Sequence, residues 1–234
     1  MKPLIHFAAA LAAGLCFATS TSAAPVTLTQ LSGVTGGILA ATAVYKADLS
    51  TVGLGSLLSL SISDNSGGLG GATGKFTGFD LDAVILSTTD CADAACAKGL
   101  AGLPLFDFIS GTFFTPGSQR PIADPQLFGT GAGGISVDNA IATLGLLDGE
   151  SSTGPEAFGF LSMGDNGVLS FNLNAAISTA GLFLYIGEVG NNGEVAASTI
   201  TVRDTPADVP EPASLALLGL GAAAMLGLRR RRSA

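Results

Sequence analysis

Two aspartates that are two residues apart, Asp80 and Asp82, have the residue type and the spacing for glycan chemistry. Side chains at positions i and i+2 of a strand share a face, about 7 Å apart at the usual rise per residue. Two carboxyl groups at such a separation hydrolyse glycosides, one of them as the acid. However, Phe79, Leu81 and Ala83 alternate with them. We therefore expect the aspartates on the solvated face of a half-buried strand, with a carboxylate-based glycan-processing enzyme as the alternative.

Aspartate and asparagine residues occur together in three segments that are predicted to be loops. Calcium takes carboxylate and amide oxygens as ligands, so these loops favour either a structural calcium ion or a calcium-dependent glycan-binding module. None of them has the EF-hand spacing, and Asp and Asn are also ordinary turn-forming residues. We therefore predict no metal site and no cofactor, and keep a structural calcium ion as the alternative. The residues are Asp64 and Asn65, Asp90 and Asp93, and Asp165 and Asn166.

Residues 1–23 have the parts of a secretory signal peptide. Lys2 supplies a basic start, residues 7–17 form an uninterrupted run of apolar or small residues, and small residues follow. Signal peptidase is expected to cut between Ala23 and Ala24. The sequence therefore predicts an exported protein.

Removal of the signal peptide changes the available chemistry. The only histidine, His6, and one of the three cysteines, Cys16, lie within it. The mature chain therefore lacks the Ser-His-Asp and Cys-His arrangements and every histidine ligand for zinc, and we predict no catalytic residue. The two remaining cysteines, Cys91 and Cys96, are an even pair in an exported protein, which predicts a disulfide that closes a small loop.

The charge balance excludes one class of partner. The formal net charge of the chain is −8, and five of its ten basic residues lie in the two terminal segments, so the middle is more acidic still. Binding to nucleic acid requires a basic surface that releases counterions from the phosphates. We therefore expect no nucleic-acid partner, whereas neutral sugars and divalent cations remain compatible with the composition.

The elements that must position these residues are mainly strands. Charged residues make up only 12% of the chain, which contains 33 glycines, a composition that disfavours a helical bundle. Apolar and polar residues alternate over 58–63 and 169–174, as in strands with one face in a core. We predict one secreted β-rich domain over residues 24–208, all-β, with a β-sandwich or jelly-roll-like fold.

Two Asn-Gly pairs predict the turns of this domain. Asn166-Gly167 separates residues 158–163 from 168–173, and Asn192-Gly193 separates 182–189 from 194–202. Since Asn-Gly readily supplies the positive φ angles of tight turns, both are predicted to be β-hairpins. One helix is expected over residues 138–147, with Asp138 as its N-cap.

Residues 209–234 form a separate C-terminal segment. It begins with Val209-Pro210-Glu211-Pro212, continues with sixteen uncharged residues at 213–228 and ends near a cluster of arginines at 229–232. Sixteen helical residues reach about 24 Å, short of a roughly 30 Å hydrocarbon core but able to insert with local thinning. The arginines favour the cytoplasmic side. This predicts a short transmembrane helix whose preceding domain lies outside.

A Pro-Glu-Pro motif followed by an apolar helix and an arginine cluster resembles the PEP-CTERM sorting signal of Gram-negative bacterial surface proteins. The resemblance implies recognition by an exosortase, a membrane-embedded cysteine transpeptidase that cuts near the motif and passes the protein to the surface or the exopolysaccharide matrix. It also implies a transient inner-membrane anchor at residues 213–228. The sorting motif would be Val209, Pro210, Glu211 and Pro212, and the stop signal Arg229, Arg230, Arg231 and Arg232.

The resemblance concerns sorting only, because PEP-CTERM proteins differ widely in the domain before the tail. The expected partners are signal peptidase, an exosortase-like enzyme and extracellular polysaccharide, and the membrane is contacted transiently through the C-terminal helix. For residues 24–208 we expect a structural or adhesive role at the cell surface or in the matrix. The two alternatives are those named above, a glycan-processing enzyme and a calcium-dependent glycan-binding module.

Overall fold

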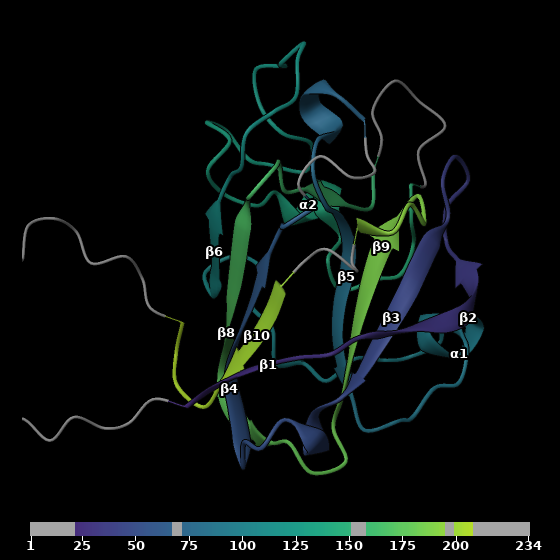
Figure 1. The fold of residues 1–234 in the computed structure, drawn as a ribbon, viewed down its shortest axis with the longest axis vertical. Helices are drawn as coiled ribbons and strands as arrows, with labels where there is room; N and C mark the ends of the chain where they lie inside the picture. The colour runs from purple at the N-terminus through teal and green to yellow at the C-terminus, as the bar shows by residue number, and fades with distance from the viewer. Residues whose placement is uncertain (1–21, 67–71, 151–157, 195–198, 208–234) are drawn as a thin grey trace, which may run out of the picture.

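The computed structural model describes residues 22–66, 72–150, 158–194 and 199–207. In this part of the chain, two five-stranded antiparallel sheets face each other (Figure 1). Helices are limited to the short α1 (Ala94–Lys98) and α2 (Asn139–Ala142) and two 3-10 turns (Leu49–Thr51 and Gly74–Phe76). The prediction of an all-β sandwich is confirmed for the described residues.

The strands of each sheet come from distant parts of the sequence. Sheet A has the order β1-β10-β4-β8-β6, and sheet B has the order β2-β3-β9-β5-β7. In sheet A the strands are β1 (Ala23–Pro25), β10 (Thr199–Arg203), β4 (Ser56–Ser63), β8 (Val168–Ser178) and β6 (Thr112–Thr115). In sheet B they are β2 (Thr29–Thr35), β3 (Thr42–Asp48), β9 (Phe183–Val189), β5 (Asp80–Ser87) and β7 (Leu161–Ser162).

The main core fills the space between the two sheets. Sheet A contributes Ile62 and Phe171, and sheet B contributes Leu184 and Ile186, all of them almost completely buried. Because side chains of a strand alternate between its faces, each of these strands also presents an outer face. On sheet B, part of the outer face is covered by α1 and by the loop after α2, so both faces of its central strands are buried.

Both predicted hairpins are wrong. The strand before Asn166-Gly167, β7, pairs with β5 in sheet B, whereas the strand after it, β8, lies in sheet A. Asn192-Gly193 likewise follows β9 of sheet B and precedes β10 of sheet A. Asn166 (φ 66°) and Gly193 (φ 88°) do adopt the left-handed conformation that their residue types permit. The sequence signal therefore identifies the turns, but the strands on either side of each turn belong to different sheets.

The predicted helix over residues 138–147 is shorter than expected. Asp138 is its N-cap, as predicted, and accepts a hydrogen bond from the backbone N–H of Ala140 at 3.0 Å. The helix α2 ends at Ala142, because Thr143 takes a left-handed conformation with φ 47°. The following residues form a loop, 143–150, that packs on the outer face of sheet B, where Leu147 joins a small apolar cluster with α1.

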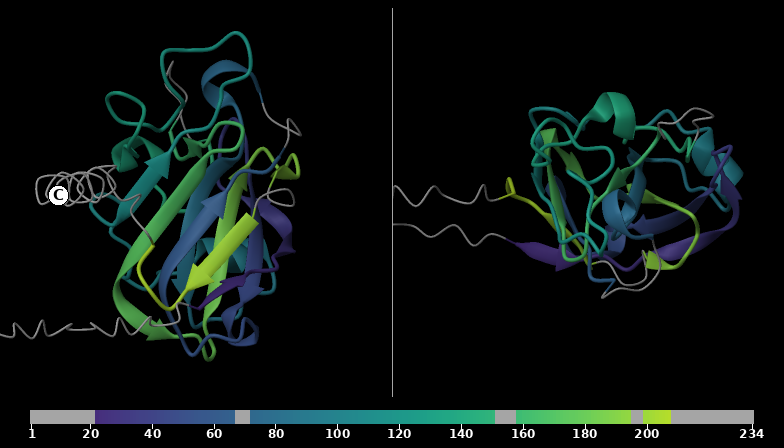
Figure 2. Two further views of the ribbon diagram at one scale, coloured as in Figure 1. Left: turned by 60° about the vertical axis from the view of Figure 1, so that its left-hand side comes forward. Right: turned by 90° about the horizontal axis from the view of Figure 1, so that it is seen from above.

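The two ends of the described chain lie side by side. Ala23 of β1 pairs with Arg203 of β10, and the backbone N–H of Asp204 donates to the carbonyl of Ser22 at 3.4 Å. The chain therefore enters and leaves the domain at the same edge of sheet A (Figure 2).

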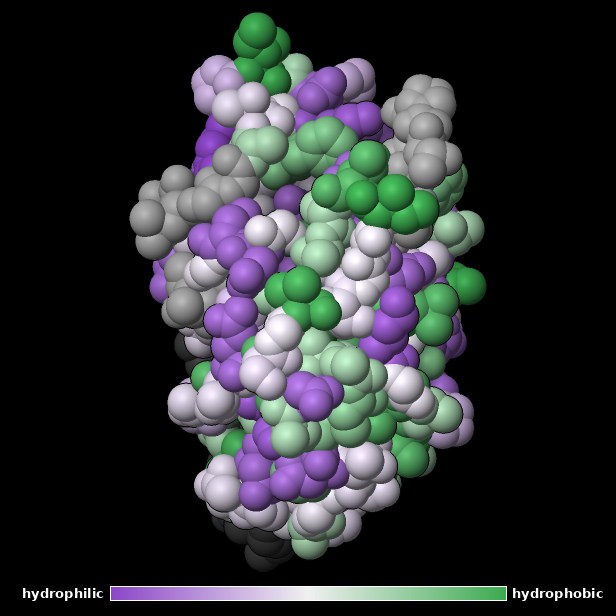
Figure 3. Space-filling model, turned by 90° about the vertical axis from the view of Figure 1, so that its right-hand side faces the viewer, coloured by the Kyte–Doolittle hydropathy of each residue, from purple (hydrophilic) through white to green (hydrophobic). Residues whose placement is uncertain are grey.

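One edge of sheet B is formed by β2, which follows β1 in the chain. Its surroundings expose several large apolar side chains, namely those of Val34, Ile38 and Leu39. On the face of the molecule seen in Figure 3, hydrophobic residues are interspersed with polar ones and form no continuous band.

Candidate functional site

The segments predicted to direct export lie mainly outside the described residues. These are residues 1–21 of the predicted signal peptide, and the whole sorting motif, apolar helix and arginine cluster of residues 209–234. The bond expected to be cut, Ala23–Ala24, is described and lies in β1. Among the described residues, none of the helices has the length and apolar character needed to span a membrane.

The structure corrects the expectation that Asp80 and Asp82 form a solvated face. Every residue of β5 is buried; Asp80 is 9% exposed and Asp82 is completely buried. The alternation of polar and apolar residues misled the prediction because loop 143–150 and the segment around Phe160 cover the outer face of sheet B. The two carboxyl groups also meet different surroundings, so they do not form one site.

Asp82 forms a closed structural pair with Asp148. The hydroxyl of Thr42 and the backbone N–H of Gly149 both donate to the Asp82 carboxyl group, and Thr143 donates to Asp148 at 3.0 Å. Burial, the first cause, and the neighbouring charge of Asp148 raise the pKa of Asp82. Asp82 therefore retains its proton and shares it with Asp148, fastening loop 143–150 to sheet B.

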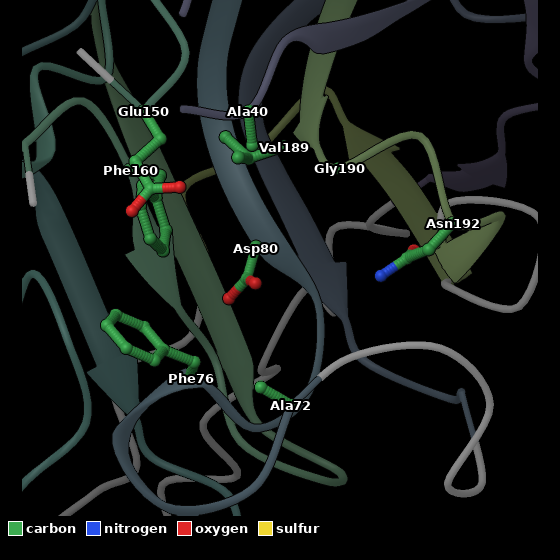
Figure 4. A pocket seen from close by; sticks show the side chains of 9 residues that line it. All are labelled: Ala40, Ala72, Phe76, Asp80, Glu150, Phe160, Val189, Gly190 and Asn192. Atoms are coloured by element: carbon green, nitrogen blue, oxygen red, sulfur yellow. The ribbon is translucent and has the colours of Figure 1, made fainter. Parts of the chain in front are cut away.

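Asp80 instead borders a cavity of about 410 Å³. Pockets of roughly 300 to 1,000 Å³ are the usual size for small ligands. The cavity lies over the end of β9 and is lined by Ala40, Ala72, Phe76, Asp80, Glu150, Phe160, Val189, Gly190 and Asn192. Figure 4 shows Phe76 and Phe160 on one side, Asn192 on the other and Asp80 between them.

Aromatic packing holds one wall of the cavity in place. The rings of Phe76 and Phe160 lie 6.0 Å apart, and both contact Phe128, at 5.4 Å and 4.6 Å between centroids. Such tilted arrangements are favourable for aromatic pairs. The ammonium group of Lys75 lies 5.1 Å from the centroid of Phe76. The wall is therefore a packed apolar surface with the ammonium group of Lys75 at its border.

The polar groups of the cavity come from three separate segments. Asp80 begins β5 and accepts a hydrogen bond from the Ser162 hydroxyl. Burial, followed by the charges of Glu194, Glu188 and Glu150, raises the pKa of Asp80 well above its ordinary value, although Ser162 lowers it. The backbone of Glu150 is fixed to Ala40 by a hydrogen bond of 3.1 Å. The cavity thus combines a carboxyl group with a raised pKa, a second acid and the amide of Asn192 with an aromatic wall.

The loops that suggested calcium are brought together in part. Asp64 accepts the backbone N–H of Asn166 at 2.8 Å, so these two predicted loops meet. However, the second oxygen of Asp64 accepts the Ser66 N–H, and Asp165 receives two hydrogen bonds from Arg120, at 3.0 and 2.6 Å. Both acids are thus occupied by protein donors.

The third of these loops has a structural role. Asp90 pairs with Lys46 at 2.6 Å, and Asp93 is the N-cap of α1. Cys91 and Cys96 are joined by a disulfide with 5.5 Å between their Cα atoms, as predicted. The disulfide links α1, which contains Cys96, covalently to the loop before it, which contains Cys91. Asp90 and Asp93 are therefore accounted for by local structure.

Two acids that the sequence analysis missed are completely buried at the same end of the sandwich. Burial raises the pKa of Glu188, in β9, to about 8 and that of Glu194 to about 7. The sequence does contain a signal for Glu188, because it is the one acid in the otherwise apolar strand Phe183–Val189. An acid at such a core position is rare without a partner. Within the described ranges, no three His, Cys, Asp or Glu side chains are grouped so that they would hold a metal ion.

Comparison with known proteins identifies the C-terminal segment. The sequence model of one family, described as the PEP-CTERM protein-sorting motif, matches residues 208–232. No curated protein and no solved structure matches the chain. The matched segment contains both the Pro-Glu-Pro motif and the arginine cluster, and it implies export, processing by an exosortase-type enzyme and cell-surface sorting in a Gram-negative bacterium. The chain therefore carries a PEP-CTERM sorting motif at residues 208–232, the signal of exosortase-sorted proteins.

Proposed function

We propose that the exported domain is an adhesive module that binds extracellular polysaccharide in the cavity bordered by Asp80. The observation that supports this proposal is the combination of an aromatic wall with carboxyl and amide groups in a cavity of about 410 Å³. Sugars present both apolar C–H faces and hydroxyl groups, so they suit a site with one apolar side and a few placed polar groups. The acidic composition favours neutral glycans over polyanions.

The proposal includes the sorting route. Residues 213–228 hold the chain in the inner membrane for a short time, with Arg229–Arg232 on the cytoplasmic side. An exosortase-type enzyme cuts near Pro210–Pro212 and releases the domain to the surface or the polysaccharide matrix. The proposed glycan contact would then keep the released domain in that matrix.

Binding is tested with the full chain, exported and processed in a Gram-negative host, and exopolysaccharide purified from the producing bacterium. Isothermal titration should show saturable binding. Asn192→Ala should weaken it about tenfold, since a lost hydrogen bond of ordinary strength is worth about 1.4 kcal/mol. Asn65→Ala is the matched control, because Asn65 is an exposed loop asparagine that does not line the cavity. Absence of saturable binding, or equal losses in both variants, would reject the proposal.

A carboxylate-based glycan hydrolase is the second candidate, and one observation favours it. Burial raises the pKa of Asp80, as suits a general acid, and a second carboxyl group, that of Glu150, lines the same cavity. Asp82, the partner expected from the sequence, does not line it. In the same preparation, release of reducing ends that disappears in Asp80→Asn would support hydrolysis. Binding without any release of reducing ends would exclude the hydrolase and support the adhesive module.

A further inference from the structure

Glu188 has its carboxyl group on the inner face of sheet B, in the core of the sandwich. It is directly opposite Ala43 of β3 and Leu81 of β5 in the antiparallel register. Residues directly opposite each other point to the same face of a sheet, and both neighbours belong to the main core. Glu188 itself is 0% exposed. This glutamate lies beside the cavity residue Val189 in sequence but faces the other way.

The hydrogen bonds of Glu188 are incomplete. Its Oε1 atom accepts a long bond of 3.4 Å from the backbone N–H of Asn192, and its Oε2 atom is buried without any hydrogen-bond partner. Buried polar atoms in folded proteins are nearly always paired, so an unpaired carboxyl oxygen requires an explanation such as a bound ion. A second buried oxygen, Oγ of Ser66, also lacks a partner at this end of the sandwich.

The charged and titratable groups around Glu188 are mostly acids. Glu194 and Asp80 are close enough for their charges to interact with it, Tyr45 of β3 contributes its hydroxyl group, and Asp64 interacts with Glu194. Arg120 contributes one positive charge, which is bonded to Asp165. Among the described groups around Glu188, acids therefore outnumber bases, and their proximity helps to raise the pKa values of Glu188 and Asp80.

We propose that Glu188 and Glu194 hold a divalent cation, with calcium as the best match, between the two sheets at the end of β9. Calcium prefers oxygen ligands, and backbone carbonyl, hydroxyl and water oxygens would complete its shell around the two carboxylates. The cation supplies the missing partner of Oε2 and displaces the proton that burial favours on Glu188. The site is independent of glycan binding and does not use Asp64, Asp90 or Asp165, the acids of the loops that the sequence suggested.

Terbium luminescence can locate the ion, because the chain contains no tryptophan and only two tyrosines. Terbium replaces calcium at oxygen sites and luminesces when a nearby tyrosine transfers energy to it. Tyr45 lies close to Glu188 on the inner face, whereas Tyr185 belongs to the outer-face cluster with α1. We expect luminescence in the full exported chain that calcium displaces, that Tyr45→Phe removes and that Tyr185→Phe keeps.

Calorimetry after treatment with a chelator gives the second measurement. Calcium at a hundredfold excess over its dissociation constant should raise the Tm by roughly 5 to 10 °C. The isosteric change Glu188→Gln should abolish this increase while the variant still folds, because a neutral amide fits the same space. Glu150→Gln is the control and should keep the increase. No response to calcium, or an equal response in Glu188→Gln, would overturn the proposal.

Discussion

Two buried acidic groups in sheet B differ in how their oxygens are used. The Asp82–Asp148 pair on the outer face has a donor at each carboxyl group, from Thr42, Gly149 and Thr143. Glu188 on the inner face has one oxygen without a partner. Burial and raised pKa values are common to both places. The difference shows that burial of an acid does not by itself indicate function, whereas an unsatisfied oxygen points to a missing ligand.

The satisfied pair nevertheless contributes to the cavity. It fixes loop 143–150, whose carbonyl at Asp148 accepts a hydrogen bond from the Gly37 N–H. The backbones of Gly37 and Gly149 approach so closely that a Cβ atom on Gly149 would lie 2.7 Å from the Gly37 nitrogen. Both have positive φ angles, so only glycine suits these positions. This contact positions Glu150, which follows Gly149 in the chain, at the cavity.

The largest expected effect is on stability, and it distinguishes the Asp82–Asp148 pair from Glu188. Asp82→Ala should lower the free energy of unfolding by about 3 kcal/mol, because it leaves the buried Thr42 hydroxyl and Gly149 N–H without an acceptor. Glu188→Gln, without calcium, should change it by less than about 1 kcal/mol, because Oε2 has no bond to lose. Urea unfolding followed by circular dichroism measures both. Similar losses in the two variants would show that Glu188 is also a structural acid.

The fold was predictable from the sequence more fully than the candidate sites. Alternation over 58–63 identified β4, although a register shift between Leu57 and Ser59 turns Leu57 rather than Leu58 inward. Asn-Gly pairs located two turns but not the sheets that they connect, because pairing partners are set by long-range packing. For the same reason, the alternation around Asp80 and Asp82 could not reveal the loop that covers them.

Part of the pH dependence of stability should come from the Asp82–Asp148 pair, in addition to Glu188 and Glu194, whose pKa values are also raised. In the unfolded chain these groups lose their protons near pH 4, whereas burial raises the pKa of Asp82 in the folded protein to about 8. The folded state therefore binds more protons between these values, and the stability that Asp82 contributes is fully present below about pH 4 and is lost as the pH rises through about 8. Urea unfolding at several pH values measures this slope.

The variant Asp82→Asn tests the origin of that slope. An amide resembles the neutral carboxyl group and does not titrate, so the variant should lose stability less steeply as the pH rises. Calcium should leave the contribution of Asp82 unchanged, because this pair lies on the outer face and needs no ion. If the slope of stability against pH is unchanged in Asp82→Asn, other groups titrate in this range. The contrast between Asp82 and Glu188 would then be weaker.

The smallest effect concerns one hydrogen bond of the pair. Thr42→Val keeps the shape of a fully buried side chain and removes the hydroxyl that donates to Asp82. The expected loss is about 1 kcal/mol, the ordinary net value of a buried hydrogen bond. Because this bond lowers the pKa of Asp82, its loss should raise that pKa further, which an NMR titration of the carboxyl carbon would detect. If Thr42→Val lowers the stability but leaves the pKa of Asp82 unchanged, Thr42 contributes through packing alone. A joint change would show that the donors around Asp82 set both its proton affinity and the attachment of loop 143–150.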